Sequence, residues 1–201
     1  MIDFKKDGIT VLSLFDGVSC AKLALERAGI KINKYYSSEI DKTALTIQQH
    51  HYGNDPNFIE LGDVKSINGH KLADEVDLII MGPPCTNLSS INPVDRRGLE
   101  GSESRLFYEA VRILKEIKVL KPKNSKLYFL MENVASMRNT DRDKITEELN
   151  NIFDEINLLK IDSALITPGH RRRYYWTNIP NVTIPEPKSI KLSDILEIAA
   201  G

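Results

Sequence analysis

Short apolar runs alternate with amphipathic stretches along most of the chain. Uninterrupted apolar runs favour buried strands, and apolar residues spaced three or four positions apart favour helices. The sequence therefore predicts strands over residues 9–15, 34–38, 58–61, 76–81, 126–131, 156–166 and 174–179. It predicts helices over residues 20–28, 41–50, 102–119, 141–151 and 193–199. Because continuous apolar strands alternate with helices, we expect an α/β fold with a doubly wound, mostly parallel sheet covered on both faces.

The breaks between these elements indicate one domain and a tail. Gly29 closes the first helix, and Asp41 is the expected N-cap of the second. The segment 180–187 contains three prolines and marks the end of the compact pattern. We therefore expect a single domain over residues 1–180 and a tail with a short helix over residues 181–201.

Composition narrows the possible classes of protein. The 201 residues include 27 Lys and Arg against 28 Asp and Glu, which excludes a globally basic nucleic-acid binder and leaves only a local basic cluster for such a partner. No apolar run is long enough to cross a membrane, and the charged N-terminus is unlike a signal peptide. Two cysteines make neither a disulfide framework nor a metal cluster, so we expect a cytoplasmic protein without a metal.

Three strand ends in the first third of the chain suggest a ligand crevice. The turn from Phe15 to Ser19 joins a strand to a helix, Glu39 follows the second strand, and Asp63 follows the third. The carboxyl ends of neighbouring parallel strands share one crevice, where a carboxylate accepts hydrogen bonds from ribose hydroxyls or an adenine amino group. Each feature alone is ordinary, because strand-to-helix turns often contain glycine and single acids often cap helices; Asp41 is expected to be only a cap.

Two further strand ends present reactive side chains. Cys85 follows Pro83 and Pro84, which stiffen the backbone and fix the direction of the thiol. A partly exposed cysteine near positive charge is a strong nucleophile, although a lone cysteine is more often a small buried hydrophobe. Glu132 stands where the apolar run 126–131 ends, and a carboxyl group beside an apolar pocket can donate a proton.

The basic cluster lies near the C-terminal end of the predicted domain. Arg171, Arg172 and Arg173 stand directly before Tyr174, Tyr175 and Trp176. Arginines beside aromatic rings suit the recognition of phosphates and bases. The alternative is a charged strand entry followed by core aromatics, which we expect for part of the segment.

These segments, in this order and spacing, resemble the C5-cytosine DNA methyltransferases that use S-adenosylmethionine. The Phe-x-Gly, Pro-Cys, Glu-Asn-Val and Arg-x-Arg motifs of that family match Phe15-Asp16-Gly17, Pro83-Pro84-Cys85, Glu132-Asn133-Val134 and Arg171-Arg172-Arg173. Residues 86–109 look most like the de novo branch of the family. The resemblance covers nearly the whole chain and implies the Rossmann-like methyltransferase fold, with residues 1–180 as the catalytic domain.

The resemblance also implies roles for individual residues. Cys85 would add to carbon 6 of a flipped-out cytosine, and Glu132 would hold or supply a proton at N3. Arg173 would bind the exocyclic oxygen with support from Arg171, while the segment 86–101 closes over the base. S-adenosylmethionine would be bound by a set of residues at the strand ends: Phe15, Asp16, Gly17, Val18, Ser19, Glu39, Ile40, Asp63, Val64 and Pro83.

The sequence departs from the family pattern in two places. Ser19-Cys20-Ala21 stands where the first loop of the family usually has a further glycine, so the loop is expected to be tighter. Family members continue past the Arg-x-Arg strand with a target recognition domain and a last motif that helps to close the cofactor pocket. We therefore expect a second polypeptide, or a further C-terminal segment, to supply target recognition, with the apolar positions of the tail as one docking stripe.

Three interpretations remain open at this stage. The first is an active DNA cytosine methyltransferase of the kind found in DNA methylation and restriction-modification. The second is a catalytically silent, cofactor-binding regulatory relative, which loss of Cys85 or Glu132 would have favoured. The third is an RNA cytosine methyltransferase on the same scaffold. Neither the target sequence nor the oligomeric state can be inferred from these residues.

Overall fold

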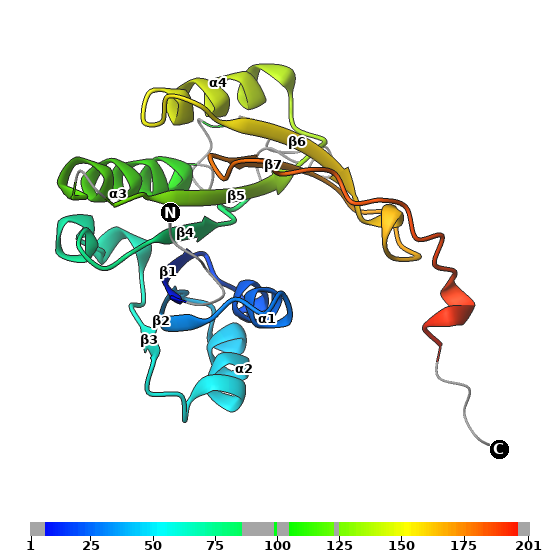
Figure 1. Ribbon diagram of the computed structural model, residues 1–201, viewed down its shortest axis with the longest axis horizontal. Coiled ribbons are helices and arrows are strands. Elements are labelled where there is room, and N and C mark those ends of the chain that lie inside the picture. Colours follow the sequence, from blue (N-terminus) through cyan, green and yellow to red (C-terminus); the bar gives the residue numbers. More distant parts are fainter. Residues whose placement is uncertain (1–6, 86–98, 100–104, 123–124, 197–201) are drawn as a thin grey trace.

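The computed structural model describes residues 7–85, 99, 105–122 and 125–196, which form one mixed sheet with helices on its faces (Figure 1). The strands are β1 (Ile9–Leu14), β2 (Ile32–Ser38), β3 (Phe58–Glu60), β4 (Leu78–Met81), β5 (Tyr128–Val134), β6 (Asn157–Asp162) and β7 (Arg172–Thr177). Their order in the sheet is β3-β2-β1-β4-β5-β7-β6. The first five strands are mutually parallel, which confirms the predicted α/β fold with a mostly parallel sheet.

Four α-helices and several 3₁₀ turns connect the described strands. The helices are α1 (Cys20–Arg27), α2 (Lys42–Tyr52), α3 (Leu106–Leu120) and α4 (Asn139–Asn150). The 3₁₀ turns are η1 (Val64–Ser66), η2 (Gly69–Leu72) and η4 (Ser163–Leu165), and η5 (Leu192–Asp194) follows the last strand. Asp41 caps α2 as predicted, because its carboxylate accepts from the Ala44 amide at 2.8 Å. Within the described residues, none of the helices has the length and hydropathy of a membrane-spanning segment.

The one antiparallel strand is β7, which lies between β5 and β6. The link from Asp162 to Arg172 is too short for a crossover to a parallel neighbour, so β6 and β7 form a hairpin. The predicted strand 156–166 is therefore too long: it ends at Asp162, whose carboxylate caps η4 through the Ala164 amide.

Two other boundaries differ in ways that affect the site. The strand predicted to end at residue 131 continues to Val134, because β7 pairs with it as far as Val134↔Arg173. Glu132 is thus inside β5 and not beyond its end. The helix predicted over residues 193–199 is a 3₁₀ turn at Leu192–Asp194 within the described residues, and residues 197–199 lie outside them. The start of the helix predicted from residue 102 is also outside the described part.

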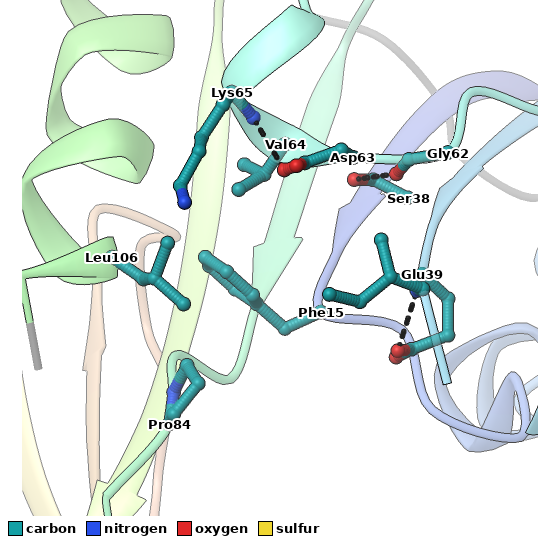
Figure 2. Close-up of a pocket in the computed structure, with 10 residues that line it drawn as sticks. Phe15, Ser38, Glu39, Gly62, Asp63, Val64, Lys65, Pro84 and Leu106 are labelled. Carbon is teal, nitrogen blue, oxygen red and sulfur yellow. Dashed lines mark hydrogen bonds between the residues drawn. The ribbon is translucent and has the colours of Figure 1, made fainter. Parts of the chain in front are cut away.

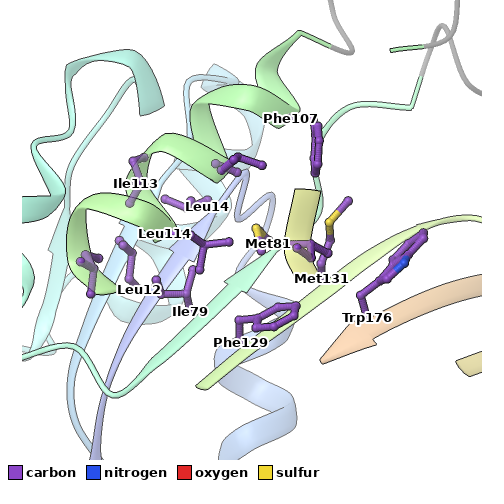
Figure 3. Close-up of a cluster of buried hydrophobic side chains, with 14 of the residues drawn as sticks. Leu12, Leu14, Ile79, Met81, Phe107, Ile113, Leu114, Phe129, Met131 and Trp176 are labelled. Carbon is purple, nitrogen blue, oxygen red and sulfur yellow. The ribbon is translucent and has the colours of Figure 1, made fainter. Parts of the chain in front are cut away.

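The core divides into two clusters, one on each face of the sheet. On the main face, α3 and α4 cover alternate strand residues, and most of the largest buried side chains meet there (Figure 3). That cluster includes Leu12, Leu14, Ile79, Met81, Phe107, Ile113, Leu114, Phe129, Met131 and Trp176. On the second face, Ile9, Val11, Tyr35, Leu78 and Tyr128 pack with residues that include Leu25 of α1. This two-sided burial explains the continuous apolar runs.

Candidate active site at the carboxyl ends of the strands

A cavity of about 180 Å³ lies at the carboxyl ends of β1 to β4, beside the start of α3 (Figure 2). Most of its lining residues lie at a strand end or within a few residues after it: Phe15, Ser38, Glu39, Ile40, Gly62, Asp63, Val64, Lys65, Pro84 and Leu106. The structure thus brings together Phe15, Glu39, Ile40, Asp63 and Val64 of the predicted cofactor set. The other predicted members, Asp16, Gly17, Val18, Ser19 and Pro83, are outside this lining, and Pro84 occupies the place expected for Pro83.

The loop after β1 has an unusual backbone. Phe15, Gly17 and Ser19 have φ angles of 57°, 58° and 60°. A bulky residue with positive φ is an outlier that costs on the order of 1–3 kcal/mol and persists only where its surroundings hold it. In this conformation the Phe15 ring faces the cavity (Figure 2). A Cβ atom added at Gly17 would meet no atom within 4 Å, so a ligand can approach the backbone there.

Glu39 links the loop after β1 to the turn after β2. One carboxylate oxygen accepts from the Gly17 amide at 2.7 Å, and the other accepts from the amides of Ile40 and Asp41 at 2.8 and 2.9 Å. A carboxylate has about four acceptor positions. Three are used, so Glu39 can accept one further hydrogen bond from a bound hydroxyl group.

Asp63 is the second acidic residue in the lining of the cavity. Its carboxylate accepts from the Lys65 amide at 2.9 Å and so caps η1, while the carbonyl oxygen of Gly62 accepts from the Ser38 hydroxyl at 2.8 Å. Figure 2 shows the Phe15 ring between Leu106 and Glu39, with Asp63 beside Val64 at another edge of the cavity. Acids near an apolar floor suit a ligand with a sugar and a flat heterocycle.

Asp16 is directed away from the cavity. Its two carboxylate oxygens accept from the side chains of Ser13, Tyr35, Ser19, Ser37 and Gln48. Ser19 is buried, and its hydroxyl group is used by Asp16 without capping α1. The Asp16 side chain is thus occupied by groups of the protein itself, and its part in cofactor binding stays a prediction.

The predicted catalytic residues meet at the adjoining ends of β4, β5 and β7. Arg173 Nε lies 2.7 Å from Glu132 Oε1, and Arg171 Nη2 lies 3.9 Å from the same oxygen. The other carboxylate oxygen, Oε2, points to the turn after β4, because a Cβ atom on Gly82 would be 3.8 Å from it. Cys85 lies in that turn and is partly buried against the main-face core. The segment 86–98, most of the loop expected to close over the base, lies outside the described residues.

Two residues that support this cluster were not predicted as site residues. The Asn133 side chain donates to the carbonyl oxygen of Pro83 at 3.1 Å. Asp162 accepts hydrogen bonds from the Arg171 amide, the Arg172 guanidinium and His170. These bonds hold the two ends of the β6–β7 connection together. The Ala164 amide, followed by His170, holds the pKa of the Asp162 carboxyl well below its usual range. Asn133 stands in a motif already singled out by sequence, whereas no sequence signal marked Asp162.

Residues 9–177 match the family model "C-5 cytosine-specific DNA methylase". The chain belongs to this family. Members of the family take their methyl group from S-adenosylmethionine. The match includes every predicted catalytic and cofactor-binding residue.

Individual relatives agree with that assignment. The chain is 30% identical over 196 residues to the type II methyltransferase M.HhaI of Haemophilus parahaemolyticus, covering 92% of this chain and 55% of that protein. It is 37% identical over 127 residues to DNA (cytosine-5)-methyltransferase DRM2 of rice, covering 58% of this chain and 21% of that protein. The chain therefore spans between about a fifth and just over half of these relatives.

Solved structures support the fold alone. The methyltransferase EhMeth of Entamoeba histolytica superposes with a TM-score of 0.68 at 17% identity, covering 91% of this chain and 57% of that one. A putative DNA modification methyltransferase from an Escherichia coli prophage gives 0.60 at 24% identity, covering 84% and 46%. Both values agree with the seven-stranded sheet described above.

Proposed function

We propose that this chain binds S-adenosylmethionine and transfers its methyl group to carbon 5 of a cytosine in DNA through a covalent Cys85 adduct. The observation that carries the proposal is the Arg173–Glu132 pair at 2.7 Å, which faces the Cys85 turn on the sheet edge that also holds the cavity. The two free cysteines suit a reducing compartment, and we place the reaction in the cytoplasm.

The cavity residues fit the cofactor. Glu39 has one acceptor position left for a ribose hydroxyl, and Asp63 stands where an adenine amino group can be bound. Phe15, Val64 and Leu106 offer apolar contact to the heterocycle, and open space at Gly17 admits the rest of the molecule. When bound, the cofactor supplies an electrophilic methyl group.

Cys85 would start the reaction as a thiolate that forms a bond from sulfur to carbon 6 of cytosine. The electron pair of the carbon 5–carbon 6 double bond moves into the ring and makes carbon 5 nucleophilic. Carbon 5 then takes the methyl group. Loss of the carbon 5 proton to a base restores the double bond and expels the Cys85 thiolate, so the enzyme returns to its starting state.

Glu132 and Arg173 would stabilise the ring during the attack. Arg173 occupies Glu132 Oε1 and leaves Oε2, on the Gly82 side, to hold a proton at ring N3. Arg173 itself is only 18% exposed in its side chain, so its guanidinium is fixed where it can also donate to the exocyclic oxygen of the base. Arg171, 67% exposed, would support it from the solvent side.

We also propose that another polypeptide segment completes the protein. Leu130, Leu159, Ile161 and Tyr175 are partly exposed on the second face of β5, β7 and β6, and none belongs to either core cluster of the described residues. A doubly wound sheet normally has both faces covered. Residues 1–180 would form the catalytic domain, and the tail over 181–201 would lead toward the covering segment, from a partner chain or the same one. Target recognition would come with it.

The decisive experiment traps the covalent adduct. Duplex DNA with 5-fluorocytosine opposite an abasic site makes the base easy to flip, so the test does not depend on target recognition. With S-adenosylmethionine, the parent chain should form an adduct that survives denaturation. Cys20→Ala, which changes the other and exposed cysteine, should form it equally, and Cys85→Ala should not.

The same experiment separates the other interpretations. An adduct with the matched RNA and none with DNA would identify an RNA methyltransferase. Cofactor binding without an adduct on either would identify a silent relative. An adduct that forms with Cys85→Ala would move the nucleophile elsewhere.

A further inference from the structure

The Phe15–Ser19 loop has an unusual backbone, because three of its five residues have positive φ. Two of the three, Phe15 and Ser19, are not glycine, so the backbone is strained there. The loop forms one side of the cavity through Phe15 and contacts Glu39 through the Gly17 amide. Its shape therefore determines two elements of the proposed cofactor site at once. What holds this shape is the side chain between Phe15 and Gly17.

Asp16 is that side chain, and it is a partly buried carboxylate at the centre of several hydrogen bonds. Oδ1 accepts from the Ser13 and Tyr35 hydroxyls at 2.5 and 2.7 Å. Oδ2 accepts from three further groups: Ser19 Oγ at 2.5 Å, Ser37 Oγ at 2.8 Å and Gln48 Nε2 at 3.1 Å. Five donors are more than the roughly four acceptor positions of one carboxylate. Asp16 is therefore saturated by the protein and has no position left for a ligand.

Tyr35 is the most rigid of the five donors. It is fully buried in β2, and its ring stacks on Phe58 at 5.6 Å, which in turn stacks on Tyr52 of α2 at 5.3 Å. Burial, together with the Asp16 charge, raises the pKa of the Tyr35 phenol far above its usual value, so the hydroxyl stays a donor at every ordinary pH. The serine hydroxyls rotate freely by comparison, so the ring fixes where Asp16 lies.

We infer that Tyr35 is a positioning residue for the cofactor site, acting through Asp16 to hold the Phe15–Ser19 loop in its strained, ligand-ready form. Without the Tyr35 hydroxyl, the loop loses the anchor that offsets its strain, and both the Phe15 ring and the Gly17–Glu39 bond become mobile. The inference rests on the proposed function for the identity of the ligand, and on the loop geometry for everything else.

The adjacent tyrosine provides a matched control. The Tyr36 hydroxyl also donates to a carboxylate, at 3.0 Å, but that carboxylate is Glu75, which also pairs with Lys34 and lies outside the cavity lining. Tyr35 and Tyr36 are neighbours on one strand and point to opposite faces. Replacing either by Phe removes one hydroxyl and one hydrogen bond without changing the shape of the ring.

The first measurement needs no ligand. Hydrogen–deuterium exchange of the whole chain should show faster exchange over residues 15–19 in Tyr35→Phe and unchanged exchange there in Tyr36→Phe. Equal exchange over 15–19 in both variants would overturn the inference, whatever the chain binds. Ser37→Ala, which removes another Asp16 donor, should give a smaller acceleration and supplies the test should Tyr35→Phe not fold.

The second measurement is the affinity for S-adenosylmethionine by calorimetry. One lost hydrogen bond corresponds to about fivefold weaker binding for Tyr35→Phe, and Tyr36→Phe should bind like the parent at a similar loss of thermal stability. If both variants lose affinity equally, the role is merely structural and the inference is wrong. A parent chain that binds no cofactor, yet shows the exchange difference, would refute the proposed function and leave the positioning role of Tyr35 standing.

Discussion

The side-chain amide of Asn133 donates to the carbonyl oxygen of Pro83 across 3.1 Å. It joins the strand that holds Glu132 to the turn that holds Cys85, and it does so from a fully enclosed position, at 2% exposure. A buried carbonyl oxygen without a hydrogen-bond donor lowers the stability of the folded protein, so this bond fixes the turn after β4. The distance between the proposed nucleophile and the proposed proton holder thus depends on the side chain of a residue that has no proposed part in the reaction.

Asn133→Ala should slow formation of the Cys85 adduct while leaving cofactor affinity nearly unchanged. The variant removes the donor to Pro83 and leaves a buried acceptor unpaired, at a cost of about 1–3 kcal/mol in stability. Asn178→Ala is the matched control, because Asn178 bonds the backbone of Phe129 and Leu127 near the other end of β5. Similar stability losses with a slower adduct only in Asn133→Ala are expected; slowing in both would show that general loosening is the cause.

Glu39→Ala should weaken S-adenosylmethionine binding more than Asp63→Ala. Glu39 holds the Gly17 amide and has an acceptor position for the ribose, whereas the exposed Asp63 carboxylate already caps η1. Calorimetry on both variants decides the order. Asp41→Ala is the control, since it removes a helix cap worth about 1 kcal/mol two residues from Glu39. Unchanged affinity in both Glu39 and Asp63 variants would move the cofactor elsewhere.

Much of this site follows from the sequence because its residues stand where apolar runs stop. Phe15, Glu39, Asp63 and Cys85 could be placed at one edge of a parallel sheet by that rule alone. The direction of the Asp16 side chain could not be predicted in this way. The positive φ of Phe15 breaks the alternation of side-chain directions on which sequence patterns depend.

Pairings between segments far apart in the sequence could not be predicted from the hydrophobic pattern either. Glu132 lies inside β5 only because β7 pairs with its last residues, and β7 enters the sheet between β5 and β6 through a hairpin. Asp162 clasps that hairpin through backbone and side-chain donors up to ten residues away. Local apolar periodicity contains no information on either relationship.

Glu132→Gln should lower turnover by roughly 10²–10⁴-fold, the usual contribution of one general acid or base. Glutamine keeps the shape and can still accept from Arg173, so cofactor affinity should stay close to that of the parent. Turnover is measured as methyl transfer into DNA, and affinity by calorimetry. A variant with parental turnover would place the proton donor on another residue.

Asp162→Asn should loosen the arginine hairpin in a pH-dependent way. The folded-state pKa of Asp162 is depressed, first by the Ala164 amide and then by His170, so its stabilising effect is present above the unfolded pKa of about 4. That effect is lost as the pH falls through the lower, folded-state value. The difference in melting temperature between parent and variant should therefore be full at pH 7 and shrink below about pH 4. A difference independent of pH would rule out the carboxylate charge as the cause.

The uncovered part of the second face is a predicted surface for self-association of the chain. Leu159 pairs with Tyr175 on that face, whereas its neighbour Leu158 pairs with Trp176 on the main face and is also exposed, so the two leucines differ in the face that they occupy. Purified chain should self-associate at high concentration through the exposed apolar side chains. Leu159→Glu should suppress this association and Leu158→Glu should not, as measured by sedimentation velocity.

Because part of the sheet is uncovered, we expect that the chain by itself shows no robust, sequence-selective methylation of duplex DNA. Its net charge of −1 offers little general affinity for phosphates, and in the basic cluster Arg171 and Arg173 face Glu132 while Arg172 bonds Asp162. Base readout needs elements that enter a groove, and the described residues form the sheet, its helices and a tail with exposed Leu192, Ile195 and Leu196.

Methyl transfer is measured on ordinary duplex and on duplex with an unpaired cytosine, each with the purified chain alone. Activity confined to the unpaired cytosine is expected, because flipping is then nearly free. Equal and selective activity on ordinary duplex would mean that the described surface already reads DNA, and that no further segment is needed.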